Sequence, residues 1–204
     1  MAKLLLLPSA ETDWHAQRRL AGDTDLPLSE AGMRMAVGHA PVLATYNPTV
    51  VYSGPEESAR QTASLLAHEL RLRSRAVDGL KEVSLGHWQG LTEEEFEERF
   101  GKVARVWRSE PLSVTPPEGE SLLEADARLA EALAKLIKRR KDDTLVLVLG
   151  PMACALVRCR FAPDGFERFW EFVDEPQSHH ELDATAADFK RPPMIPPRAE
   201  EEHS

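Results

Sequence analysis

The sequence of 204 residues lacks several features that would point to particular classes of protein. It has only two cysteines, Cys154 and Cys159, which lie five positions apart in one predicted helix and therefore on different faces of it. They make a poor disulfide pair, so we expect two buried thiols in a reducing compartment. No apolar run approaches the length of a membrane span, and the four leucines at positions 4–7 are too few for a signal peptide. We expect a cytoplasmic protein that does not contact a membrane.

The chain also carries fewer positive than negative charges. The chain has 25 Lys and Arg residues against 34 Asp and Glu residues, a net charge of −9. A nucleic-acid surface needs a basic face, so we expect no nucleic-acid partner. The content of 42% hydrophobic and 29% charged residues is ordinary for a globular domain that can bury a core. We expect a single domain over residues 1–187, followed by a Pro-rich, acidic and flexible tail over 188–204.

The apolar pattern predicts strands that alternate with helices. Short apolar or β-branched runs predict strands at 3–7, 49–52, 75–77, 144–149 and about 178–182. The run TLVLVL at 144–149 is typical of a parallel strand covered on both faces. Helices are expected over about 29–45, 56–72, 92–100, 103–108, 121–141 and 151–160, with Ser29 as an N-cap and capping boxes at Thr92–Glu95 and Ser121–Glu124. This order predicts a three-layer α/β/α sandwich with a mostly parallel central sheet.

The first strand runs directly into a loop. The segment KLLLLPSAETDW covers residues 3–14, and its apolar run ends at Pro8, Ser9 and Ala10. Functional sites of α/β sheets lie at the carboxyl ends of the strands. We therefore look for the chemistry of the protein in this loop.

Several sequence motifs occur in one order along the chain. Glu11, Thr12 and Trp14 match the pattern R-H-G-E-T-x-W-N. The pattern L-x-G-x-x-D-x-P-L-S-x-x-G matches residues 20–32, and S-x-x-x-R-[AS]-x-Q-T-A looks like residues 53–63. The patterns L-x-E-x-x-x-G-x-W-x-G-L, G-G-E-S and V-x-V-S-H-G look like residues 80–91, 118–121 and 146–151.

Together these motifs resemble the histidine phosphatase superfamily, in its phosphoglycerate mutase-like branch. The resemblance covers residues 3–160 and implies a phosphoglycerate mutase-like fold. It also implies a reaction in which a phosphoryl group passes to a first histidine. Two arginines and a second histidine hold the phosphate oxygens, and a glutamate protonates the leaving oxygen.

The sequence departs from the family where this chemistry takes place. The R-H-G positions are Pro8, Ser9 and Ala10, and the second histidine falls at Gly150 or within one residue of it. Pro8 cannot clamp phosphate with a guanidinium, and an unassisted serine hydroxyl is a poor nucleophile. The interpretation that follows is a degenerate member without the catalytic histidines. It would be a pseudophosphatase with a binding, structural or regulatory role, a protein partner or a second copy of itself, and no cofactor.

Two family positions keep residues that could still act. Glu82 holds the position of the acid, and Arg60 is assigned to the second phosphate-binding arginine. His15 stands where the first motif has Asn, and it is the candidate base nearest to Ser9 in sequence. Arg60 and His15 could keep a weak anion or phosphate site, or Arg60 and Glu82 could pair with each other or with neighbours. The alternative function is a phosphomonoester hydrolase or mutase-like enzyme with a pocket rebuilt around Ser9, His15, Arg60 and Glu82.

Other arrangements are less specific. A triad of Ser9, His15 and either Glu11 or Asp13 is conceivable, but spacing within one loop says nothing about geometry. His179 and His180 could bind a metal with His87, although neighbouring strand residues point to opposite faces. Residues 192–197 could dock as a polyproline ligand, or could be part of a solvated tail.

Overall fold

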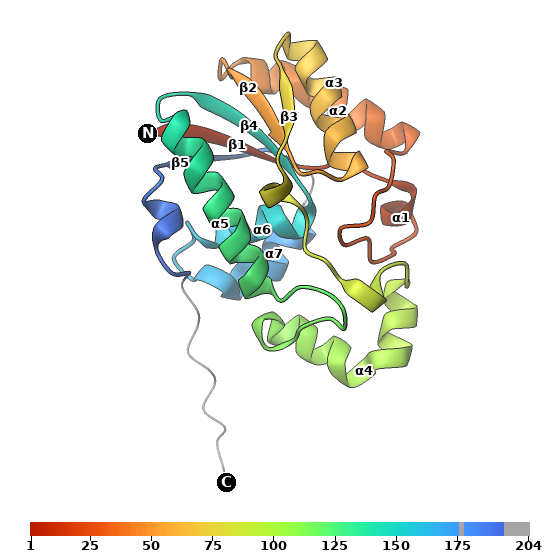
Figure 1. Ribbon diagram of the computed structural model, residues 1–204. Helices are drawn as coiled ribbons and strands as arrows, with labels where there is room; N and C mark the ends of the chain where they lie inside the picture. Colours follow the sequence, from red (N-terminus) through yellow and green to blue (C-terminus); the bar gives the residue numbers. More distant parts are fainter. Residues whose placement is uncertain (176–177, 194–204) are drawn as a thin grey trace.

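The centre of the computed structural model is a five-stranded sheet (Figure 1), and the structure describes residues 1–175 and 178–193. The strands are β1 (Ala2–Pro8), β2 (Val50–Ser53), β3 (Ser74–Ala76), β4 (Thr144–Leu149) and β5 (His180–Ala184), in the order β3-β2-β4-β1-β5. The first four run parallel, and β5 pairs antiparallel with β1. The predicted α/β fold with a mostly parallel sheet is confirmed.

Helices cover both faces of this sheet (Figure 1). One face carries α2 (Glu30–Ala44) and α3 (Glu57–Leu70), and the other carries α5 (Leu122–Arg139), α6 (Pro151–Cys159) and α7 (Phe169–Asp174). Away from the sheet lie α1 (Asp13–Ala16) and α4 (Glu93–Ser109). Short 3-10 helices occupy Asp78–Leu80, Gly86–Trp88, Pro111–Ser113, Gly165–Arg168 and Asp188–Lys190.

The leucine run of β1 is explained by these two layers. Successive side chains of a strand point to opposite faces. Leu4 and Leu6 pack into the core beneath α5 and α6, whereas Leu5 and Leu7 pack into the core beneath α2 and α3. All four are fully buried, so no position in the run suits a polar residue.

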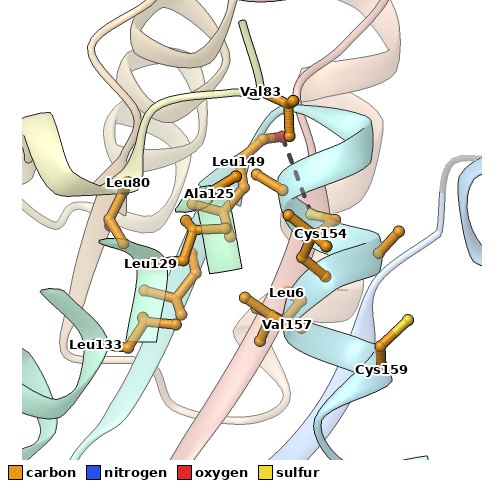
Figure 2. Close-up of a cluster of buried hydrophobic side chains, with 14 of the residues drawn as sticks. Leu6, Leu80, Val83, Ala125, Leu129, Leu133, Leu149, Cys154, Val157 and Cys159 are labelled. Carbon is orange, nitrogen blue, oxygen red and sulfur yellow. Dashed lines mark hydrogen bonds between the residues drawn. The ribbon is translucent and has the colours of Figure 1, made fainter. Parts of the chain in front are cut away.

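Figure 2 shows the larger core, where Leu6 lies among Leu129 and Leu133 of α5 and Val157 of α6. Cys154 belongs to the same cluster, and its thiol and that of Cys159 are free and buried, as predicted. Burial raises the pKa of both thiols, which keeps them protonated.

The predicted helix starts are confirmed. Ser29 caps α2, and the capping boxes of Thr92 with Glu95 and of Ser121 with Glu124 open α4 and α5. The two short helices expected over 92–100 and 103–108 form a single element, α4, with non-helical dihedral angles at Phe100. The break that the sequence suggests is therefore a kink inside one helix.

The packed chain extends past the boundary expected at residue 187. Residues 188–190 form a 3-10 helix, and the buried ring of Phe189 lies 5.6 Å from that of Phe161. The rest of the expected tail, residues 194–204, lies outside the described residues, and so does most of the Pro-rich segment 192–197. In the part of the chain that the structure describes, no helix is both long and apolar enough to cross a membrane.

Candidate active site

The loop after β1 is fixed by hydrogen bonds from two other elements. The Ser9 N–H donates to the carbonyl oxygen of Leu149 at 2.7 Å, which joins the ends of β1 and β4. The Ala10 N–H donates to the Thr62 hydroxyl of α3 at 3.0 Å. Thr62 belongs to the Q-T-A motif, so this motif residue positions the backbone of the loop.

Glu11 ties the same loop to the start of α2. Its carbonyl oxygen accepts the Ser29 N–H at 2.9 Å, and its carboxylate accepts the Ser29 hydroxyl at 3.1 Å. Gly32 lies against this backbone, and a Cβ there would overlap the carbonyl oxygen of Glu11. These motif residues therefore hold the loop in place.

A cavity of about 170 Å³ opens where β1 and β4 end. Ser9, Ser58, Glu56, Glu82 and Gly150 line it near the ends of these strands. The helices α4 and α7 line it with aromatic rings and acidic side chains, among them Phe96, Trp107, Trp170, Glu97 and Asp174. Pro8 and Ala10 do not line it: Pro8 ends β1, and Ala10 is buried with Leu28 and Ala36.

Glu82 is the buried acid at the base of the cavity. Its Oε1 accepts the N–H groups of Val83 at 2.6 Å and Ala153 at 2.9 Å, and its Oε2 accepts the Met152 N–H at 2.8 Å. Burial raises the pKa of Glu82 to about 8, with a further rise from the nearby Glu56, against the three N–H donors that lower it. At neutral pH the carboxyl group therefore holds a proton for most of the time.

Gly150 leaves the space that Glu82 fills. Met152 and Ala153 are among the first residues of α6, so the carboxyl group of Glu82 sits at the N-terminus of that helix, a position that suits an anion. A Cβ at Gly150 would overlap the carboxyl group. A side chain at this position is thus compatible with the structure only if Glu82 moves.

Arg128 of α5 holds the segment that carries Glu82. Its guanidinium donates to the carbonyl oxygens of Gly79 at 3.2 Å and Lys81 at 2.9 Å, and forms two hydrogen bonds with the Glu120 carboxylate. A guanidinium held on both sides in this way restricts movement of the segment that precedes Glu82. The acid is therefore placed by α5 as well as by α6.

His15 lines the cavity from the short helix α1. Its Nδ1 accepts the Thr12 N–H at 3.2 Å, so the neutral ring carries its proton on Nε2. Burial lowers the pKa of His15, and Glu11 only partly offsets this. The ring is therefore a neutral hydrogen-bond donor toward the cavity, and its Nδ1 is occupied by the cap of α1.

Arg60 does not reach the cavity. Its half-exposed guanidinium pairs with Glu57 at 2.9 Å and Asp25 at 3.8 Å on the outer side of α3. In the motif S-x-x-x-R-[AS]-x-Q-T-A the arginine directly precedes [AS]-x-Q-T-A, which places it at Ser58 and makes Arg60 the variable residue. Ser58 does line the cavity. The prediction that Arg60 binds phosphate is therefore wrong, because the motif spacing places the arginine position at Ser58 and not at Arg60.

Three polar residues of the cavity were missed by sequence reasoning: Ser58, Glu56 and Arg19. Ser58 could have been found by counting the motif spacing. Glu56 carries no motif signal, because its burial depends on the segment of Glu82, 26 positions later, whose N–H donates to Glu56 Oε1 at 2.8 Å. Arg19 also lines the cavity, and it too carries no motif signal.

The other arrangements considered from the sequence do not assemble. The Glu11 carboxylate bonds to Ser29 and His15 Nδ1 bonds to Thr12, so neither is set up for a triad with Ser9. His179 contacts the Tyr46 hydroxyl at 3.3 Å, whereas His180 lies 3.6 Å from Glu175. Within residues 1–175 and 178–193, no group of three or more His, Cys, Asp or Glu side chains could hold a metal ion.

Comparisons with known proteins agree with this fold. The family model described as Histidine phosphatase superfamily (branch 1) matches residues 4–190. Phosphoserine phosphatase 1 of Hydrogenobacter thermophilus is 31% identical over 172 residues, which are 84% of this chain and 82% of that protein. Glucosyl-3-phosphoglycerate phosphatase of Mycobacterium tuberculosis is 33% identical over 135 residues, which are 66% of this chain and 60% of that protein.

A solved structure extends the comparison. Mycobacterial glucosyl-3-phosphoglycerate phosphatase in complex with VO3 superposes with a TM-score of 0.76 at 26% identity, over 88% of this chain and 90% of that chain. These relatives are named as phosphatases, which contradicts the expectation of a catalytically inactive protein with a purely binding or regulatory role. The alternative expectation of a phosphomonoester hydrolase agrees better with them.

Proposed function

Because the chain belongs to the histidine phosphatase superfamily, branch 1, we propose that it hydrolyses phosphomonoesters in the cavity at the ends of β1 and β4. One observation carries the proposal. Glu82 occupies the family's acid position, lines the cavity and holds a proton at neutral pH because burial raises its pKa to about 8. A protonated acid beside a phosphate does not repel it and can donate to the leaving oxygen.

The route differs from that of the family because Ser9 and Gly150 stand at the two histidine positions. Phosphoryl transfer passes through a loose transition state, in which the attacking group needs little activation. We therefore assign attack on phosphorus to a water molecule positioned by the Ser9 hydroxyl. As the ester P–O bond breaks, Glu82 donates its proton to the leaving oxygen. The attacking water releases a proton in turn, and this proton restores the protonated form of Glu82.

The phosphate oxygens are held mainly by neutral donors. Ser9 and Ser58 offer hydroxyl groups, and His15 offers Nε2–H. Arg19 supplies a guanidinium at the cavity wall, although it also donates to the carbonyl oxygen of Gly90 at 2.6 Å and lies 3.8 Å from Glu95. Arg108 also lines the cavity, but Asp174 holds it at 3.3 Å. Because both guanidinium groups of the wall are already engaged, binding of phosphate alone is expected to be weak.

A pair of esters with different leaving groups tests the role of Glu82. An alkyl phosphate needs a proton on its leaving oxygen, whereas p-nitrophenyl phosphate has a good leaving group and needs little help. Glu82→Gln is expected to lower kcat for the alkyl ester by roughly 10²- to 10⁴-fold and to affect the aryl ester much less. In the wild type, kcat for the alkyl ester should fall as pH rises through about 8, because Glu82 loses its proton.

Glu131→Gln is the matched control, since Glu131 is exposed on α5 and pairs with Lys135. It should leave both rates unchanged. Equal losses for the two esters in Glu82→Gln would show that Glu82 is not the acid. Failure of the wild type to release phosphate from either ester would overturn the proposed function.

A further inference from the structure

A groove of about 710 Å³ lies between the edge strand β3 and the helix α5. Arg75, Val77 and Gly79 line it from β3 and the segment that follows, and Ala132 and Leu136 line it from α5. Within residues 1–175 and 178–193, no residue lines both this groove and the cavity at the ends of β1 and β4. The groove is therefore separate from the proposed active site.

The walls of this groove are strongly basic, although the chain as a whole has a net charge of −9. Five of the side chains that line it are cationic: Arg75, Arg128, Lys135, Arg139 and Arg140. Among the described residues that line it, Glu131 is the one acid. A concave site with charge of one sign raises the local concentration of ions of the opposite sign. The groove therefore favours an anionic ligand.

Two of the five cations are available to such a ligand. In the part of the chain that the structure describes, Arg75 and Arg139 form no ion pair, and both are exposed. Arg75 belongs to β3 and Arg139 to the last turn of α5, so they come from opposite walls of the groove. A guanidinium can hold a phosphate group through two parallel N–H···O bonds. Two such groups across one groove suit a ligand with two phosphate groups.

Other cations of the groove are already engaged within the protein. Arg128 pairs with Glu120 at 2.6 Å, and Arg140 pairs with Asp143 at 3.1 Å. Their guanidinium groups add positive charge to the walls but are not free to turn toward a ligand. Direct contacts with an anion therefore fall to the two arginines without an ion pair.

The size of the groove decides the class of anion. Small-molecule sites have volumes of roughly 300–1,000 Å³, and about 710 Å³ falls within this range. A nucleic acid needs a basic surface of roughly 1,000 Å² or more, which a chain with a net charge of −9 does not favour. The anion that fits is therefore a small molecule.

We propose that this groove binds a small anion with two linked phosphate groups, the chemistry of inorganic pyrophosphate, and that Arg75 and Arg139 bind it from opposite walls. The proposal goes beyond the proposed function, because it concerns a different site and requires no hydrolysis.

Calorimetric binding of two matched probes tests this inference. Methylenediphosphonate carries two phosphonate groups on a carbon bridge that a phosphatase does not hydrolyse, and methylphosphonate carries only one. The wild type should bind the diphosphonate at least about tenfold more tightly, because the second group adds hydrogen bonds between charged partners. Binding should weaken as the salt concentration rises. Arg75→Gln and Arg139→Gln should each weaken binding of the diphosphonate by at least about tenfold.

Two control variants remove a positive charge elsewhere. Arg34→Gln changes an exposed arginine of α2 that lies 3.9 Å from Glu30, and Arg19→Gln changes the wall of the other cavity. Both should bind the diphosphonate as the wild type does, and circular dichroism checks that each variant is folded.

Three results would overturn the inference. They are a wild type that does not bind the diphosphonate, undiminished binding in folded Arg75→Gln and Arg139→Gln, and a loss of binding in Arg19→Gln alone, which would place the probe in the other cavity. Because neither probe is hydrolysed, the outcome does not depend on the proposed function. Binding that requires Arg75 and Arg139 would support the site even in a protein without phosphatase activity.

Discussion

At the scale of single residues, Glu82 has the most consequences. It accepts three backbone N–H groups, yet burial still raises its pKa to about 8. Gly150 leaves it the space at the start of α6. The proposed acid chemistry and the contacts with the start of α6 therefore fall on one carboxyl group.

The pKa of Glu82 predicts how stability changes with pH. The folded chain binds a proton more tightly than the unfolded chain, whose reference value is 4.5. The stabilisation is complete below that value. It is lost as pH rises toward about 8, by about 1.4 kcal/mol of unfolding free energy per pH unit. Urea denaturation at pH 5.5, 6.5 and 7.5 should show this slope in the wild type relative to Glu82→Gln. Parallel pH profiles for the two proteins would contradict the assigned pKa.

The sequence identified Glu82 but not its neighbours. Its position in a long motif with fixed spacing marks it as a candidate. Arg60 was misplaced by a two-residue error in register, which moves a helical side chain to a different face of α3. Glu56 could not be recognised, because its contact with the Glu82 N–H exists only once distant segments are packed together.

At the scale of elements, α4 connects local sequence signals with the cavity. The capping box of Thr92 and Glu95 was predictable because it depends on residues three apart. The aromatic face was not, because Trp107 meets Trp88 and Trp170 across long sequence separations, with ring centroids 5.6 and 5.4 Å apart. The start of a helix thus depends on residues close in sequence, whereas the cavity wall depends on contacts between distant segments.

Loss of the α4 cap should be measurable. Thr92→Ala leaves the Glu95 N–H without its side-chain acceptor and is expected to lower the unfolding free energy by about 1 kcal/mol. Thr45→Ala, at the exposed end of α2, should cost less than about 0.5 kcal/mol. Denaturant titration of both variants separates the two cases, and equal losses would mean that the Thr92 cap contributes nothing specific.

At the scale of the whole molecule, a buried ion pair joins three segments on one face of the sheet. Arg160 at the end of α6 donates two hydrogen bonds of 2.6 Å to Asp126 of α5, and a third of 2.9 Å to the carbonyl oxygen of Arg191. Both paired side chains are almost fully buried. This contact joins α5, α6 and the segment after β5.

Breaking that buried pair should be costly. Asp126→Ala leaves the Arg160 guanidinium buried without its partner, and we expect a loss of about 3–5 kcal/mol in unfolding free energy. Replacing both residues, Asp126→Leu with Arg160→Met, should restore much of the stability. A loss below about 1 kcal/mol in Asp126→Ala alone would show that the pair behaves like a surface contact.

The parallel pairing of β1 with β4 also affects biosynthesis. Lys3 pairs with Thr144, and Leu7 with Val148, so the first strand finds this neighbour only after some 140 further residues exist. At typical rates of translation that interval is roughly 7 to 30 s. Throughout it, four adjacent leucines have no sheet to join. The nascent chain is therefore most exposed to misassociation and to chaperone capture at its own N-terminal strand.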